Sequence, residues 1–149
     1  MKKQAKAQVE KIIAEGRIEA QKFKAGIIKD AQAQSVELAS RMIAELLTET
    51  DKIALQYEFA NGIIQEIARL PKEQFNVQAL EVKVISSFPL LDRQRNELRK
   101  VLSDKIGSSV ELTEQIDPKL IGGLTIEAGG MVIDGTLKNK LQRIISYLK

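Results

Sequence analysis

The sequence of 149 residues contains no cysteine, no histidine and no tryptophan. Without cysteine there is no disulfide framework, thiol nucleophile or thiolate metal ligand. Without histidine the chain lacks the commonest general base near neutral pH and a common metal ligand. Aromatic residues make up 4% of the chain, which disfavours recognition by stacking on bases. We therefore expect that the protein is not an enzyme and that it has no cofactor, no metal site and no small-molecule substrate.

Long apolar runs are absent too. The basic start of the chain is not followed by an apolar segment, and no run of residues reaches the length of a membrane-spanning helix. These absences predict a cytoplasmic protein. The net charge is only +3, but lysine and arginine outnumber aspartate and glutamate over the first thirty residues.

Residues 1–48 are predicted to form one long stalk helix, because they contain no proline and are rich in strong helix formers. Apolar residues recur along one face in steps of three and four that resemble an 11-residue repeat, which is typical of a nearly straight or slightly right-handed coiled coil. A hairpin with residues 51–70 is the alternative. The expected interface with a partner helix consists of Val9, Ile13, Ala20, Phe23, Ile27, Ala31, Leu38, Met42 and Leu46.

Residues 49–149 are predicted to form an α+β domain. Its first helix is expected to have Asp51 as N-cap and to end before Pro71, and Gly107 is expected to close a later helix. The order of elements indicates a four-stranded mixed sheet with helices on one side. The expected helices are 51–70, 92–105 and 136–148, and the expected strands are 80–87, 110–116, 123–128 and 131–133.

Glycine, proline and aspartate in this domain are assigned to turns and caps. Gly122 and Gly123 lack the lysine and hydroxyl residue of a phosphate-binding loop, so a backbone role is favoured. Asp134 is expected to cap the last helix or to order the turn with Gly135. The residues assigned to such roles are Asp117, Pro118, Gly122, Gly123, Gly129, Gly130, Asp134 and Gly135.

Two other kinds of site receive little support. The lysines of the front end are interleaved with glutamate and glutamine without aromatic residues, so a solvated helix face is favoured over nucleic-acid binding. Proximity to an anionic membrane surface stays open as an alternative. A catalytic carboxylate pair is disfavoured because Glu111 and Glu114 lie on opposite faces of a strand.

Three segments, 84–90, 116–124 and 132–141, resemble the carboxyl-terminal part of the delta subunit of F-type ATP synthase. The helix over 1–48 is similar to the cytoplasmic helix of the b subunit, and the whole resembles the fused b/delta peripheral-stalk subunits of some bacteria. The b subunit normally starts with a membrane-spanning helix, and a complete delta subunit starts with a helical bundle. Neither is recognised here, so we expect either a trimmed chain or an anchor on another subunit.

The resemblance implies a non-catalytic stator subunit of a rotary proton- or sodium-translocating ATP synthase, which links the catalytic head to the membrane sector and resists rotor torque. The implied partners are another stalk helix (b-like or G-like), the head subunits alpha and beta (or A and B) and, indirectly, the membrane sector. The implied location is the cytoplasmic face of the membrane. The rival hypotheses are the E-type stalk subunit of V/A-type ATPases and an unrelated coiled-coil adaptor that binds nucleic acid or a membrane surface.

Overall fold

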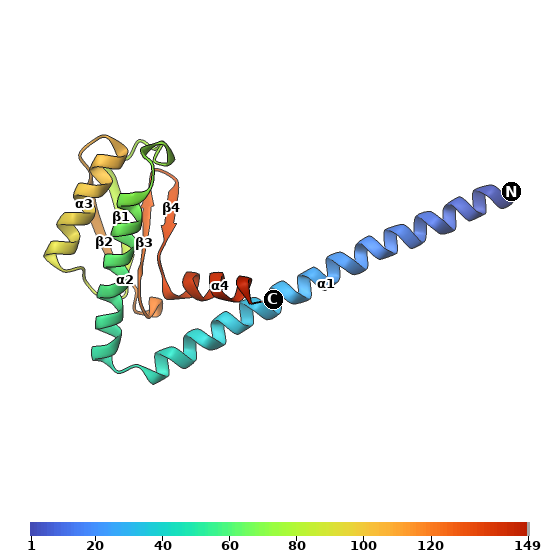
Figure 1. Ribbon diagram of the computed structural model, residues 1–149, viewed down its shortest axis with the longest axis horizontal. Helices are drawn as coiled ribbons and strands as arrows, with labels where there is room; N and C mark the ends of the chain where they lie inside the picture. Colours follow the sequence, from blue (N-terminus) through green and yellow to red (C-terminus); the bar gives the residue numbers. More distant parts are fainter. Residues whose placement is uncertain (149) are drawn as a thin grey trace.

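The computed structural model describes residues 1–148 and has an α+β fold (Figure 1). A long N-terminal helix projects from a compact unit in which helices pack on a sheet. The expected fold class is therefore confirmed. The elements are α1 (Lys2–Leu46), α2 (Glu49–Arg69), η1 (Lys72–Gln74), β1 (Glu81–Ser86), α3 (Asp92–Ile106), β2 (Glu111–Ile116), η2 (Pro118–Leu120), β3 (Leu124–Ala128), β4 (Met131–Asp134) and α4 (Leu137–Tyr147).

The chain turns sharply between α1 and α2. Thr48 is the N-cap of α2, and its side chain accepts a hydrogen bond from the backbone N–H of Asp51. The Asp51 carboxylate in turn accepts from the backbone N–H of Thr48 at 3.0 Å, which completes a capping box. The expectation that Asp51 is the N-cap was wrong, because it occupies the third helical position. The hydrogen bonds from Thr48 hold the pKa of the Asp51 carboxyl below its ordinary value.

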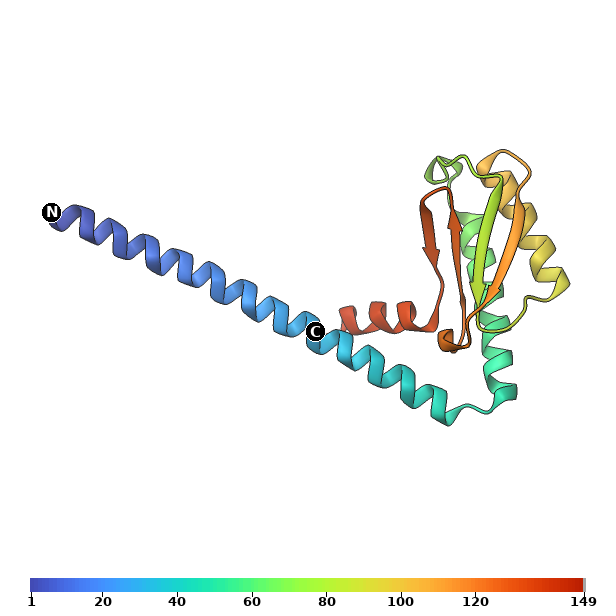
Figure 2. The same ribbon diagram turned by 180° about the vertical axis from the view of Figure 1, so that it is seen from behind.

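Helix α1 does not fold back on α2. Its carboxyl-terminal half packs against α4 instead, as both views show (Figures 1 and 2). The hairpin alternative was therefore wrong: the apolar surface that covers the end of α1 comes from the far end of the chain. Among residues 1–148 no helix is long and apolar enough to cross a lipid bilayer.

The four strands form one mixed sheet in the order β2-β1-β3-β4. Strands β1 and β2 are parallel and are joined through α3, whereas β3 is antiparallel to both β1 and β4. Val82 and Val84 alternate with more exposed residues along β1, as expected for a strand with one buried face. The expected four-stranded mixed sheet is thus confirmed.

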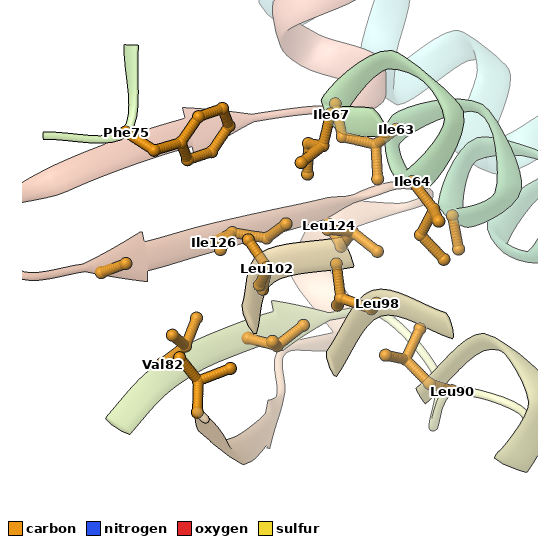
Figure 3. Packing of buried hydrophobic residues seen from close by; sticks show 14 residues of the cluster. Ile63, Ile64, Ile67, Phe75, Val82, Leu90, Leu98, Leu102, Leu124 and Ile126 are labelled. Carbon is orange, nitrogen blue, oxygen red and sulfur yellow. The ribbon is translucent and has the colours of Figure 1, made fainter. Parts of the chain in front are cut away.

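Helices α2 and α3 cover one face of this sheet, and Figure 2 shows the other face without a helix over it. The core lies between the sheet and these two helices, where aliphatic side chains from both layers meet (Figure 3). Phe75, between α2 and β1, closes one end of it. Fully buried core residues include Ile64, Ile67, Val82, Val84, Leu98, Leu102, Leu124 and Ile126.

A buried polar cluster joins α2 to the start of α3. The Gln94 side chain donates to the Tyr57 carbonyl at 3.0 Å and to the Asn61 side chain at 2.8 Å. The Ser87 hydroxyl donates to the side-chain oxygen Oε1 of Gln56 at 2.8 Å, while the side-chain nitrogen Nε2 of Gln56 has no hydrogen-bond partner among the described residues. Gln94 therefore holds the two helices together through satisfied bonds, and Gln56 carries an unsatisfied donor.

Candidate partner-binding surfaces

The rod, defined as α1, leaves most of its length uncovered. Every residue from 1 to 31 is exposed. All nine residues expected at the partner interface are exposed as well, and Phe23 and Leu46 expose 72% and 80% of their surface. Within residues 1–148 this stripe is therefore without a cover.

The face of the rod that the C-terminal part of the chain does cover is a different one. Val36 and Ser40 are the buried residues of α1. Ser40 lines a groove together with Leu137 and Lys138 of α4, and Lys138 bonds to Glu37, the neighbour of Val36. At 3.6 residues per turn, Leu38 and Met42 lie roughly 200° and 240° around the helix axis from Val36. The predicted stripe therefore lies on the side of the rod opposite α4, and both surfaces are available at once.

The α4-facing surface was missed in the sequence. Val36, Ser40, Ile43 and Leu47 follow steps of four, three and four, a helical pattern that the expected stripe left aside. That spacing was the signal by which this surface could have been found. The element that covers the surface could not be found in the same way, because α4 lies about a hundred residues further along the chain.

Helix α4 braces the rod against α2. The Lys138 ammonium donates to the Glu37 carboxylate of the rod at 2.9 Å. On the other side, the Lys140 ammonium lies 4.2 Å from the centroid of the Phe59 ring of α2. The hydrogen bond and charge of Lys138, with a further contribution from Arg41, hold the pKa of the Glu37 carboxyl below its ordinary value. The Lys138 and Glu37 side chains are 65% and 47% exposed, so this ion pair contributes little. The burial of Val36 on the rod contributes more to the brace.

A groove of about 750 Å³ runs along this junction between α1, η2 and the start of α4. Its lining includes Arg41 and Glu37 from the rod and Lys119 and Ile121 from the segment after β2. Ile121 has a positive φ of 46°, which is unusual for a β-branched residue. Neither groove nor turn presents a cluster of acidic residues: no group of three or more metal-ligating side chains occurs within residues 1–148.

Gly123 and Gly135 lie where backbone segments pack too closely for a side chain, before and after the β3–β4 hairpin. Gly123 has φ +89°, and a Cβ there would lie 2.3 Å from the Gly135 carbonyl oxygen and 2.7 Å from Thr136 Cα. A Cβ at Gly135 would lie 2.8 Å from Ile63 Cδ1 of α2. The Leu137 N–H donates to the Gly122 carbonyl at 3.0 Å. These contacts place the start of α4 directly on the β3 strand and on α2.

The assigned aspartates order turns. Asp117 precedes η2 and accepts from the Lys119 N–H at 3.0 Å, with Pro118 as the first residue of the 3₁₀ turn. Asp134 accepts from the Thr136 N–H and hydroxyl at 2.9 and 2.7 Å. Thr136, not Asp134, caps α4, because its hydroxyl accepts from the Asn139 N–H. The remaining pair, Gly129 and Gly130, forms the β3–β4 turn with φ values of +53° and +86°.

Glu114, considered above as one member of a catalytic carboxylate pair, is engaged in an ion pair. Glu114 is paired with the Arg95 guanidinium, which also donates to the Leu90 carbonyl. This hydrogen bond from Arg95 to Glu114 raises the pKa of the guanidinium further. Glu114 thus fixes β2 against α3 instead of facing a cleft.

Comparison with known proteins gives consistent matches. The family model of the ATP synthase delta (OSCP) subunit matches residues 2–148. The ATP synthase subunit delta of Ectopseudomonas mendocina is 30% identical over 141 residues, covering 80% of this chain and 79% of the relative. That of Thioalkalivibrio sulfidiphilus is 37% identical over 103 residues, covering 69% and 54%. Subunit delta 2 of Photobacterium profundum is 43% identical over 72 residues, covering 48% and 40%.

The chain spans about half the length of several of the curated relatives it matches. A chain in a cryo-EM structure of Polytomella F-ATP synthase is similar over 48% of this chain and 91% of its own length, with 28% identity and a TM-score of 0.41.

A single family model runs through both the rod and the α+β unit. The expected fusion of a b-like rod with a delta-like tail is corrected by this match, and so is the rival assignment to the E-type stalk subunit of V/A-type ATPases. The chain belongs to the ATP synthase delta (OSCP) subunit family.

Proposed function

We propose that this chain is a non-catalytic stator subunit of an F-type rotary ATP synthase, which moves protons or sodium ions. In this role it links the catalytic head to the membrane sector and resists the torque of the rotor. Membership of the delta (OSCP) family supports the proposal. The chain would lie at the cytoplasmic face of the membrane as a peripheral component.

We assign the two tasks of a stator to two parts of the chain. Residues 49–149 would dock on the alpha and beta subunits of the head, and residues 1–48 would pair with another stalk helix, such as a b-like one. A rod of 45 residues spans about 67 Å at 1.5 Å per residue. Its uncovered apolar stripe supports pairing, because an isolated amphipathic helix gains most of its stability by burying that stripe.

The observation that carries the proposal is the brace between rod and domain. Leu47 and Thr48 alone would form a flexible corner between two helices. Helix α4 spans this corner, with Lys138 bonded to the rod and Lys140 placed over Phe59 of α2. A part that transmits force needs such a strut, because a free corner would bend under torque instead of resisting it.

The test is reconstitution of a catalytic head and its membrane sector in liposomes, with and without the full-length chain. ATP hydrolysis and ATP-driven ion transport are measured together. We expect hydrolysis without the chain to continue while ion transport is lost, and transport to return when the chain is added. Equal ion transport with and without the chain would overturn the stator role.

A variant of the brace sharpens this test. Lys138→Glu places a carboxylate against Glu37 and should lower coupling slightly, because the pair is exposed, while head binding stays unchanged. The paired exchange Glu37→Lys with Lys138→Glu restores opposite charges and should recover part of the coupling. Loss of head binding by Lys138→Glu would show that α4 serves the docking surface instead of the brace.

A further inference from the structure

The charges beside the exposed stripe of the rod are not arranged symmetrically. At about 100° per residue, one flank of the stripe carries cations along the first half of the rod. The opposite flank carries Glu19 and Asp30. The cationic flank consists of Lys3, Lys6, Arg17 and Lys24, with Glu10 as its one acidic member.

None of these four cations forms an ion pair within residues 1–148. In that part of the chain, the only ion pair that involves one of the first thirty residues joins Lys11 to Glu15, and neither lies on this flank. Like charges at helical spacing repel one another, so the flank favours a ligand that brings negative charge. The apolar stripe beside it favours a ligand that also buries aliphatic side chains.

We propose that the stripe and this flank bind a separate α-helix, distinct from this chain, that carries carboxylates opposite Lys3, Lys6, Arg17 and Lys24. The proposal names the chemistry of the stalk-helix partner and rests on the stator function proposed above. The partner helix packs on the side of the rod that faces away from α4. The brace formed by α4 therefore stays in place when the partner binds.

A second copy of this chain does not supply carboxylates along the whole flank. In a parallel pair, the cationic flank faces the opposite flank of the other rod, which contains Ala5, Gln8, Ile12 and Gly16 and carries acids only further on, at Glu19 and Asp30. In an antiparallel pair it faces the same flank near the other rod's end, where Ile28, Ser35, Ala39 and Met42 lie. Neither arrangement places an acid beside Lys3 or Lys6.

A phosphate-bearing surface fits less well than a helix. Such a surface would meet Glu19 and Asp30 on the far side of the stripe and would be repelled there. A partner helix can carry acidic residues on one flank and neutral or basic ones on the other. The asymmetry of the rod is therefore complementary to an asymmetric helix.

The probe for the experiment is a pair of synthetic helical peptides of about three 11-residue repeats. Both carry the same aliphatic stripe, and they differ in having glutamate or lysine on the flank that meets the cationic flank of the rod. Binding to the full-length chain is measured by titration calorimetry at low and high salt. We expect the glutamate peptide to bind at least about tenfold more tightly than the lysine peptide, with a preference that falls as salt rises.

Two substitutions with the same residue types locate the surface. Ile27 lies on the stripe and Ile18 lies on the opposite side of the rod, and the two are 54% and 53% exposed. Ile27→Asp should weaken binding of the glutamate peptide by about tenfold or more, because it places a charge in the buried seam. Ile18→Asp makes the same change in net charge and should leave binding within about twofold.

Four results would overturn the proposal. Equal binding of the two peptides would show that charge complementarity does not contribute to binding. Equal effects of the two substitutions would show that the stripe is not the binding surface. Sedimentation equilibrium that shows a dimer of the chain alone, dissociated by Ile27→Asp, would make a second copy the occupant. Tight binding to anionic phospholipid vesicles that depends on Ile27 would make a membrane surface the occupant.

Failure here is separable from failure of the stator function. If neither peptide binds but the chain still binds the catalytic head and restores ion transport, the stator role stands and this inference is wrong. If the glutamate peptide binds as expected and coupling does not depend on the chain, the inference stands and the stator role is wrong.

Discussion

Gly123 offers the sharpest test of the structure, because its surroundings forbid a side chain. Its φ is +89°, and a Cβ would lie 2.3 Å from the Gly135 carbonyl oxygen. Gly123→Ala therefore combines two penalties. The left-handed backbone costs an L-residue about 1–2 kcal/mol, and forcing atoms into a packed junction costs about 1–3 kcal/mol more. We expect the free energy of unfolding to fall by roughly 3–4 kcal/mol.

Gly130→Ala is the matched control. Gly130 has nearly the same φ, +86°, but a Cβ there meets no atom within 4 Å. This variant carries the backbone penalty without the clash and should lose only about 1–2 kcal/mol. The difference between the two variants thus isolates the close approach of β3 to the start of α4.

The assay is urea unfolding of both variants and the parent chain, followed by circular dichroism. A domain of this size is stable by about 5–15 kcal/mol, so Gly123→Ala should shift the midpoint strongly while Gly130→Ala shifts it modestly. A Gly123→Ala chain that does not fold at all, beside a folded Gly130→Ala chain, supports the same conclusion. Equal midpoints for the two variants would refute the reasoning.

Three further predictions concern the corner between α1 and α2, the buried polar cluster and the ion pair between Glu37 and Lys138. Thr48→Ala removes the cap of α2 and should lower the free energy of unfolding by about 1 kcal/mol. Thr50→Ala, at an exposed position nearby, is the control and should be close to neutral. Equal urea midpoints for the two variants would contradict the capping box. Gln94→Leu leaves buried groups unpaired and should cost about 2–3 kcal/mol, whereas Gln56→Leu removes an unsatisfied donor but leaves the Ser87 hydroxyl without its acceptor and should cost only about 1–2 kcal/mol; the reverse order in thermal unfolding would refute this. Lys138 and, to a smaller extent, Arg41 lower the folded-state pKa of Glu37 from 4.5, so the small contribution of this exposed pair is complete above that value and is lost as pH falls through the lowered pKa; Lys138→Ala should raise the pKa of Glu37 measured by NMR titration, and an unchanged pKa would contradict the pairing.

The local elements could be read from sequence because their causes are local. The proline-free start predicted the rod, alternation along Val82 and Val84 predicted a strand, and Gly107 closes α3 with φ +84°, as expected. The Asp51 error shows the limit of this approach. Thr48 and Asp51 are both good capping residues, and only the reciprocal hydrogen bonds assign the N-cap to one of them.

The candidate surfaces divide in the same way. The exposed stripe through Phe23 and Ile27 could be listed from spacing, and its role in binding a partner stays a prediction. The brace could not be predicted from the sequence. The spacing shows that Val36 belongs to a series at helical intervals, but it does not show which distant element covers that series. The meeting of Glu37 with Lys138 requires the whole sheet to be in place between them.

The sequence by itself determined a rod, a mixed α+β unit, the positions of its turns and the absence of cysteine and histidine chemistry, because helix, strand and turn preferences act between residues close along the chain. Only the tertiary structure decided that α4 packs on the rod, that Gly123 lies against Gly135, and that the stripe faces away from this contact. These features depend on contacts between segments far apart in sequence. Such contacts follow from how the layers pack, which no local pattern specifies.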